Sequence, residues 1–393
     1  MTKHMTCITG GIIILENRLL TGKVLVFDDK ITGILDADEF EKSGYPENLR
    51  RIDARGKYVS PGFIDLHIHG AGGKDTMDGG ISDLDIIGES VAKNGVTGFL
   101  PTTLSMEREK IYQALNNISD AMKREHRGAR VLGAHMEGPF ISPTYCGAHD
   151  VAYLMKADFQ FIKDYLDVIR IVTFAPEEDP NHDFLKKVRS ESEIILSMGH
   201  TNMDYEGAMD AVKLGVSHAT HLFNAMPPLH HRQPGPVGAV LYSSVSYELI
   251  ADTIHVHPSL FSVLLNAKGK EKMILVTDSM RGAGMEPGIW ELGGQKTIAD
   301  GNSARLSDGR LAGSLLGMNT AVYNIMQHTN LKIHEAVGLG SINPARLIRM
   351  NQSKGSIEVG KDADIVIFDE SLNVERTILE GRTIYSGLSS EKT

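Results

Sequence analysis

Eight short apolar segments recur between residues 63 and 277, and most of them lead into a histidine, glutamate or aspartate. Short apolar runs bounded by turn residues are typical of strands that are buried on both faces, as in a parallel sheet. The strands that this pattern predicts cover residues 63–66, 96–100, 130–134, 169–174, 194–197, 216–220, 249–251 and 273–277. Because polar side chains gather at one end of these runs, we expect a fold in which those ends meet.

Helical patterns separate most of the expected strands. Four apolar side chains recur at the spacing of one helix face, namely Ile111, Leu115, Ile118 and Met122. A similar pattern over 205–212 is followed by Gly215, a residue type that commonly ends a helix. Alternating strands and helices form parallel βα units, and functional groups at the carboxyl ends of the strands favour a closed (β/α)8 TIM-type barrel. We expect this barrel to span residues 61–350.

Both ends of the chain differ from the middle, because they have the pattern of short strands separated by turns. The expected strands cover 12–15, 24–27, 31–35, 363–368, 374–379 and 383–385. Neither end alone has enough strands for a stable sheet pair. We therefore expect residues 1–60 and 351–393 to form one small β-sandwich domain together. Turn residues also predict an inserted hairpin near 288–313.

The composition excludes several classes of function. Lys and Arg number 40 against 50 Asp and Glu, so the formal net charge is −10 and no nucleic-acid partner is expected. No stretch approaches the roughly 20 apolar residues that span a bilayer, and no signal peptide is evident, so no membrane partner is expected. Cys7 and Cys146 are the two cysteines. Their wide separation favours a reducing cytoplasm over a disulfide scaffold.

Five polar side chains at strand ends are of types that bind transition metals: His67, His69, Glu137, His200 and His221. Imidazole nitrogen and carboxylate oxygen suit zinc or an iron-type ion. Because side chains alternate across a strand, His67 and His69 point the same way. If this pair binds, the site holds two ions or one ion with extra ligands; otherwise three ligands and an open position remain. Each residue alone could be an ordinary polar group at the rim, but the set predicts a divalent metal centre.

Further residues are candidates for chemistry or binding. Asp278 follows the last expected strand, where a carboxylate could move a proton between water and a leaving group; helix capping is the plainer interpretation. His149 lies in a loop and could stabilise charge on a carbonyl oxygen, or be an ordinary surface residue. The segment 230–232 and His255 could bind phosphate through the arginine fork, although a solvated loop fits equally well. Small residues in 311–314 would let the backbone approach a substrate.

Longer motifs carry a family resemblance. They include Glu137-Gly138-Pro139-Phe140, His221-Leu222-Phe223-Asn224-Ala225-Met226, His67-Ile68-His69 and Gly360-Lys361-Asp362-Ala363-Asp364. With these motifs the chain resembles the N-acetylglucosamine-6-phosphate deacetylases of the amidohydrolase superfamily nearly from end to end. The resemblance implies a cytoplasmic homodimer that hydrolyses a linear amide bond and releases acetate from N-acetylglucosamine 6-phosphate in amino-sugar catabolism.

The resemblance also implies roles for individual residues. The five candidate ligands match the family's metal site, with the His67–His69 pair serving a second ion. Asp278 matches the catalytic base and acid, and His149 matches the group that polarises the acetyl carbonyl. The positions that match substrate contacts are Ala148, His149, Asn224, Ala225, Arg232, His255, Leu311, Ala312 and Gly313. Arg232 and His255 would serve the phosphate, in part across a subunit interface.

One segment departs from the family. Members usually have Asp-Gly-x-His, whereas this chain has Asp252-Thr253-Ile254-His255. Threonine lacks the freedom of backbone angle that glycine has, which affects the substrate side of the site. N-acetylgalactosamine 6-phosphate, the galactosamine epimer, therefore remains an alternative substrate.

Two other functions remain as alternatives. Many other amidohydrolases, which act on different N-acyl or cyclic amides, carry a lysine at the fourth strand, but here that strand ends Thr173-Phe174-Ala175. A non-catalytic barrel that acts as a binding protein would typically have lost metal ligands. This chain keeps a candidate for every one of them.

Overall fold

A parallel barrel dominates the computed structural model, which describes residues 5–45, 49–125 and 127–387. Neighbouring strands follow chain order, and the third strand is divided into two segments. The strands are β8 (Phe63–Ile68), β11 (Val96–Thr103), β12 (Arg130–Val131), β13 (Ala134–Glu137), β14 (Ile169–Phe174), β15 (Ile195–Met198), β16 (His218–Ala219), β17 (Ser246–Ile250) and β18 (Met273–Val276). The predicted TIM-type barrel is thereby confirmed.

The first and last strands of the barrel meet at residues to which the sequence assigned chemistry. The main-chain N–H of Asp278 donates to the carbonyl of His67 at 2.8 Å, and the N–H of His69 donates to the carbonyl of Ser279 at 2.9 Å. A parallel bridge between Ile68 and Ser279 continues the contact. The closure of the barrel therefore holds the two histidines beside Asp278.

Helices cover the outside of the barrel and turn their apolar faces towards it. In α3 the predicted face is buried, with Ile111, Leu115 and Ile118 fully enclosed. The helix α6 ends at Gly215, as the sequence predicts. The barrel helices are α2 (Ile81–Ala92), α3 (Arg108–Met122), α4 (Phe159–Ile162), α5 (Asp183–Glu191), α6 (Tyr205–Leu214), α7 (Gly235–Tyr242), α8 (Ser259–Lys268), α9 (Met318–His328), α10 (Ile333–Leu339) and α11 (Ile342–Leu347).

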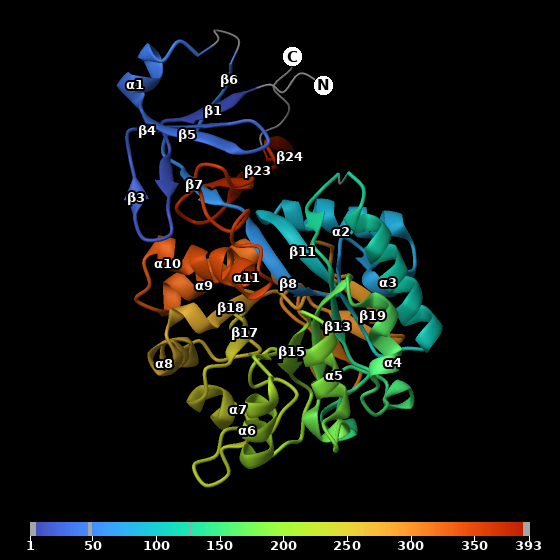
Figure 1. Cartoon of the computed structure of the whole chain (residues 1–393). Helices are drawn as coiled ribbons and strands as arrows, with labels where there is room; N and C mark the ends of the chain where they lie inside the picture. The colour runs from blue at the N-terminus through green and yellow to red at the C-terminus, as the bar shows by residue number, and fades with distance from the viewer. Residues whose placement is uncertain (1–4, 46–48, 126, 388–393) are drawn as a thin grey trace.

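Two further sheets are built from the ends of the chain, and Figure 1 shows their blue and red strands together at one end of the molecule. One sheet has the order β5 (Ile31–Asp36), β4 (Lys23–Phe27), β1 (Thr6–Thr9) and β6 (Arg50–Asp53). The other has the order β24 (Arg382–Ser386), β23 (Val374–Leu379), β22 (Ile365–Phe368), β7 (Tyr58–Pro61), β2 (Ile12–Ile14) and β3 (Leu19–Leu20). The sequence did not predict β1, β3, β6 or β7.

A shared apolar core supports treating these two sheets as one unit. It combines side chains from both ends of the chain, including Leu25, Phe27, Ile365 and Ile367. We propose that residues 1–60 and 351–393 form one small β domain, of which residues 1–4, 46–48 and 388–393 lie outside the described part. The short helix α1 (Ala37–Lys42) packs Phe40 into a separate cluster with Cys7 and Val26.

The insertion near 288–313 contains three antiparallel strands: β19 (Gly288–Leu292), β20 (Gln295–Ala299) and β21 (Ala304–Leu306). The predicted hairpin corresponds to the first two. Leu292 packs in a cluster with Leu104 and Met280, and the Gln295 amide donates to the carbonyl of Ala148. These contacts attach the insertion to loops at the mouth of the barrel.

Within the described residues, no helix combines the length and apolarity that crossing a membrane requires.

Candidate metal centre

The candidate ligands lie where barrel strands end. Glu137 is the last residue of β13, while His200, His221 and Asp278 each come two residues after a strand. The backbone φ is +47° at His200, +27° at His221 and +48° at Asp278. Residues other than glycine rarely adopt this left-handed conformation, and such strain is concentrated at functional sites. At these three residues it accompanies a turn that leaves the side chain at the mouth of the barrel.

Three ligand atoms form a compact triangle. Oε1 of Glu137 lies 3.1 Å from Nε2 of His200 and 3.0 Å from Nε2 of His221, and the two nitrogens are 3.0 Å apart. Two ligands bound at about 2.0 Å to one tetrahedral ion lie about 3.3 Å apart. The triangle therefore has close to the dimensions that a single zinc-like ion requires.

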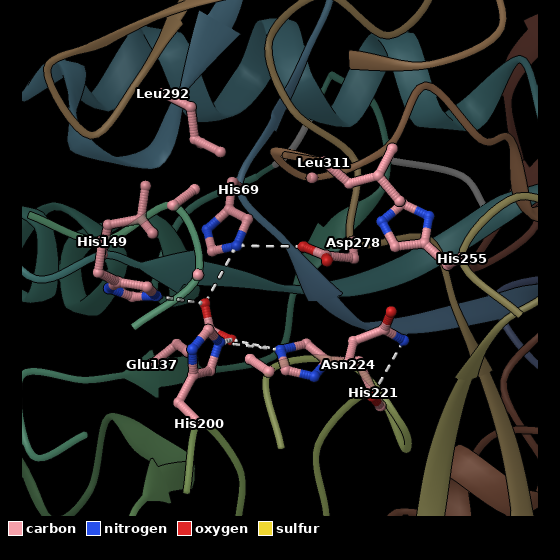
Figure 2. Close-up of a pocket in the computed structure, with 15 residues that line it drawn as sticks. His69, Glu137, His149, His200, His221, Asn224, His255, Asp278, Leu292 and Leu311 are labelled. Carbon is pink, nitrogen blue, oxygen red and sulfur yellow. Dashed lines mark hydrogen bonds and ion pairs between the residues drawn. The ribbon is translucent and has the colours of Figure 1, made fainter. Parts of the chain in front are cut away.

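A second group of atoms, from His67, His69 and Asp278, lies around the same carboxylate. Nε2 of His69 is 3.3 Å from Oε2 of Glu137 and 3.2 Å from Oδ1 of Asp278. Nε2 of His67 is 3.5 Å from Oε1 of Glu137 and 3.5 Å from Oδ1 of Asp278. Glu137 thus belongs to both groups, so its carboxylate could contact an ion held by either one. Figure 2 shows Glu137 between His69, His149, His200 and His221.

The imidazole rings have orientations suited to binding through Nε2. Nδ1 of His200 lies 2.9 Å from the carbonyl oxygen of Tyr145, and Nδ1 of His69 lies 3.3 Å from that of Thr102. A carbonyl can only accept a hydrogen bond, so each Nδ1 carries a proton and each Nε2 has a free lone pair in the neutral ring. Nε2 of His67 is buried without a hydrogen-bond partner. These donors fit a divalent cation, since an unpaired buried polar atom is otherwise costly.

The buried acids favour positive charge at this centre. Burial lowers the pKa of His69, but hydrogen bonds to Asp278 and Glu137 outweigh it and raise that pKa to about 9. Burial raises the pKa of Glu137, but the nearby histidines, first among them His67, hold it well below its ordinary value. The carboxylates are thus ionised at neutral pH, and a cation in their midst is stabilised by direct attraction.

His149 reaches the same centre from a loop. The main-chain N–H of Ser105 donates to its Nδ1 at 3.1 Å, so the proton of the neutral ring is on Nε2. That Nε2 lies 3.3 Å from Oε2 of Glu137. Burial lowers the pKa of His149 to about 4, which keeps the ring neutral at pH 7. Gly138, with φ +73°, permits this packing, because a Cβ there would lie 2.3 Å from Oγ of Ser105.

A pocket opens directly onto these residues. Of the residues that the sequence proposed for substrate contact, seven line it: Ala148, His149, Asn224, Ala225, His255, Leu311 and Gly313. Ala312 does not line it but packs fully buried beside Met280 and Leu292. Arg232 is exposed outside the pocket, where its guanidinium contacts His231. Within one chain, therefore, the structure does not bring Arg232 to the site.

Sequence reasoning missed four residues of the site, namely Leu104, Gly147, Leu292 and Glu248. Leu104 and Leu292 contribute apolar surface to the pocket, and Leu292 comes from the insertion, whose position no local pattern predicts. Glu248 is fully buried behind the metal centre, 2.9 Å from Nδ1 of His67. The sequence signal for Glu248 was its position as the single acid within the mostly apolar segment 245–251. The predicted strand began at residue 249 and therefore left Glu248 out.

The segment that departs from the family has an unusual backbone. Thr253 has a φ of +69°, so the chain adopts here the conformation that glycine favours. The Asp252 carboxylate accepts from the main-chain N–H groups of Ile254 and His255, both at 2.8 Å. It also contacts Nδ1 of His255 at 2.6 Å. The turn therefore keeps His255 at the pocket despite the threonine.

Comparison with known proteins agrees with this geometry. Residues 58–384 match the amidohydrolase family, and the chain belongs to that family. Within it, the chain is 40% identical to an N-acetylglucosamine-6-phosphate deacetylase of Bacillus subtilis (strain 168) over 382 residues, which cover 95% of each chain. The predicted family resemblance is thereby confirmed.

Two further comparisons bear on the fold and on the sugar. The crystal structure of N-acetylglucosamine-6-phosphate deacetylase from Pasteurella multocida matches with a TM-score of 0.90 at 32% identity, covering 98% of this chain and 100% of that one. An N-acetylgalactosamine-6-phosphate deacetylase of Escherichia coli O157:H7 is 32% identical over 378 residues, covering 94% of this chain and 98% of the relative.

Proposed function

We propose that this chain removes the acetyl group from N-acetylglucosamine 6-phosphate by metal-dependent hydrolysis, giving glucosamine 6-phosphate and acetate. The observation that supports this most directly is the convergence of Glu137, His200 and His221 beside Asp278. The similarity to deacetylases of this name over 95% of the chain supports the substrate. The reaction breaks a linear amide C–N bond.

The cofactor is proposed to be zinc or iron, with up to two ions. Glu137, His200 and His221 would hold one ion, and His67 with His69 would hold a second, with Glu137 between them. A divalent ion here would lower the pKa of a bound water towards about 7 and polarise the acetyl carbonyl.

Asp278 is proposed to move the proton. Burial raises the pKa of Asp278, but His67 and His69 outweigh it and bring that pKa below its ordinary value. The side chain is therefore a carboxylate at neutral pH and can accept the proton of water as its oxygen bonds to the acetyl carbon. The same proton then goes to the sugar nitrogen as the C–N bond breaks, so that acetate and a primary amine leave.

His149 is proposed to stabilise the oxyanion. Its neutral ring presents Nε2–H towards the centre, because Nδ1 is occupied by the N–H of Ser105. In the structure this N–H is directed to Glu137. With substrate bound, it is available to donate to the acetyl oxygen as negative charge develops there.

The remaining pocket residues are proposed to bind the sugar phosphate. Asn224, Ala225, Leu311 and Gly313 line the pocket around the metal centre and would contact the hexose. His255 would contact the phosphate, together with Arg232 of a second copy in a cytoplasmic homodimer, as the family resemblance implies. The exposed position of Arg232 is compatible with this role.

One assay tests the function. Acetate release would be measured from N-acetylglucosamine 6-phosphate, its galactosamine epimer and unphosphorylated N-acetylglucosamine, before and after chelation and re-addition of zinc or iron. We expect the glucosamine phosphate to be hydrolysed fastest, with loss of activity on chelation and recovery with metal. Preference for the galactosamine phosphate would favour the alternative substrate, and preference for the unphosphorylated sugar would exclude both.

A further inference from the structure

A buried carboxylate lies beneath the metal centre and is not part of the mechanism described above. Glu248 is in the middle of β17 and is fully enclosed. Its Oε2 accepts from Nδ1 of His67 at 2.9 Å and from the main-chain N–H of His221 at 3.0 Å. One oxygen therefore contacts a candidate ligand in each half of the site.

Two other histidines, His135 and His218, lie farther from this carboxylate than His67 does. Nδ1 of His135 donates to the carbonyl of Leu66 at 2.9 Å and lies 3.9 Å from Oε1 of Glu248. Nε2 of His218 lies 3.5 Å from the same oxygen, which has no hydrogen-bond partner. The short contacts of Glu248 are thus made by the ring of His67 and the backbone of His221.

His67 differs from the other candidate ligands in what supports its ring. Main-chain carbonyls accept from Nδ1 of His69 and of His200, whereas a charged side chain accepts from Nδ1 of His67. A carboxylate in this position fixes the tautomer and orientation of a metal-binding histidine and increases its basicity. Nε2 of His67 then has its lone pair directed between Glu137 and Asp278.

We propose that Glu248 is a positioning residue that enables the His67–His69 half of the centre to hold a second ion. It fixes His67 with Nδ1 protonated and Nε2 free to bind metal. The same carboxylate accepts from the main-chain N–H of His221 and so also contacts a ligand of the first ion. The inference rests on the proposed metal-dependent function.

Metal binding by the ion-free protein tests the proposal without an activity measurement. Zinc would be titrated against a competing chelator, and ions per chain counted by elemental analysis, for wild type, Glu248→Gln, His67→Gln and the double variant. Glutamine has the size of glutamate and can accept both hydrogen bonds, but it lacks the charge. Loss of such an outer contact typically weakens metal affinity about 10- to 100-fold.

We expect wild type to bind two ions and Glu248→Gln to bind the weaker ion 10- to 100-fold less tightly. In the His67→Gln background, Glu248→Gln should add no comparable loss, because the effect passes through His67. Thr97→Val is the matched control: Thr97 is buried in the same barrel, and its hydroxyl donates to the carbonyl of Phe63 near the amino-terminal ends of β8 and β11. It should bind both ions as wild type does.

Three results would overturn the proposal: a wild type that binds one ion, a Glu248→Gln variant with unchanged affinities, or an equal loss with and without His67.

If Glu248→Gln fails to fold, nitrogen NMR of the wild-type histidine rings, with His67→Gln for assignment, gives an independent answer. Zinc-loaded His67 should be protonated at Nδ1, and protonation at Nε2 would exclude the proposed role. If these results overturn the role of Glu248 but the wild-type protein still releases acetate from N-acetylglucosamine 6-phosphate, the proposed function stands without it.

Discussion

Oδ1 of Asp278 lies 3.2 Å from Nε2 of His69, at the point where β18 closes the barrel against β8. Asp278 is thus close enough to contact an ion and also to exchange a proton with a water beside it. The two roles differ in what they require, since an amide oxygen can still contact a cation but cannot carry a proton at neutral pH.

Asp278→Asn separates these roles. We expect the variant to keep the ion held by Glu137, His200 and His221, and to lose about 10²- to 10⁴-fold in kcat because the proton carrier is missing. Elemental analysis and steady-state kinetics on N-acetylglucosamine 6-phosphate measure the two effects. The exposed Asp53→Asn variant on β6 serves as a control and should match wild type. Turnover at the wild-type rate by Asp278→Asn would exclude the proton-transfer role.

Replacement of His149 tests the stabilisation of the oxyanion. His149→Ala should lower kcat about 10²- to 10³-fold, the usual effect of losing one such donor, with the number of bound ions unchanged. Ser105→Ala is the informative companion, because it removes the Oγ contact but keeps the main-chain N–H that fixes the tautomer. We expect its loss to stay below about tenfold. An equal loss of kcat in both variants would show that the hydroxyl of Ser105, rather than its main-chain N–H, sets the tautomer of His149.

The parts of this fold that were predictable from sequence are those set by local patterns. Apolar runs predicted the barrel strands, because a parallel strand buried on both faces needs a continuous apolar segment. The position of His200 and His221 just beyond such runs then indicated a shared rim. Their left-handed backbone angles were not predictable, since they arise from how each strand ends in the closed barrel.

Contacts between distant parts of the chain were not predictable. Glu248 and His67 are 181 residues apart in sequence, and nothing near either residue indicates the other. Leu292 reaches the pocket because the insertion folds over the mouth of the barrel, held in part by the contact between Gln295 and Ala148. Residues of this kind become evident only when the tertiary structure is known.

The acidity of His69 predicts how metal binding depends on pH. Its pKa of about 9 in the ion-free protein means that the ring is protonated at pH 7, and a ligand must lose this proton to bind. Affinity at this half should therefore rise about tenfold per pH unit for each proton displaced while the pH stays below about 9. Chelator competition at pH 6.5, 7.5 and 8.5 measures the slope, and His69→Gln should reduce it. An affinity that is the same at all three values would contradict the prediction.

Thr253→Gly should stabilise the protein. The φ of +69° at Thr253 places a β-branched residue in the left-handed region, at a cost on the order of 1–3 kcal/mol. Glycine removes this strain but makes the unfolded chain more flexible, which offsets about 0.5–1 kcal/mol. We expect a net gain of about 1 kcal/mol in the free energy of unfolding in urea.

Thr253→Ala provides the matched control, because it keeps the Cβ that causes the strain and should gain much less. KM for the sugar phosphate should change little in either variant, since the Asp252 carboxylate continues to hold the main chain and ring of His255. If Thr253→Gly were less stable than wild type, the threonine side chain would have to make a contribution that outweighs its backbone strain. A large rise in KM with unchanged stability would instead mean that Thr253, rather than Asp252, orients His255 at the pocket.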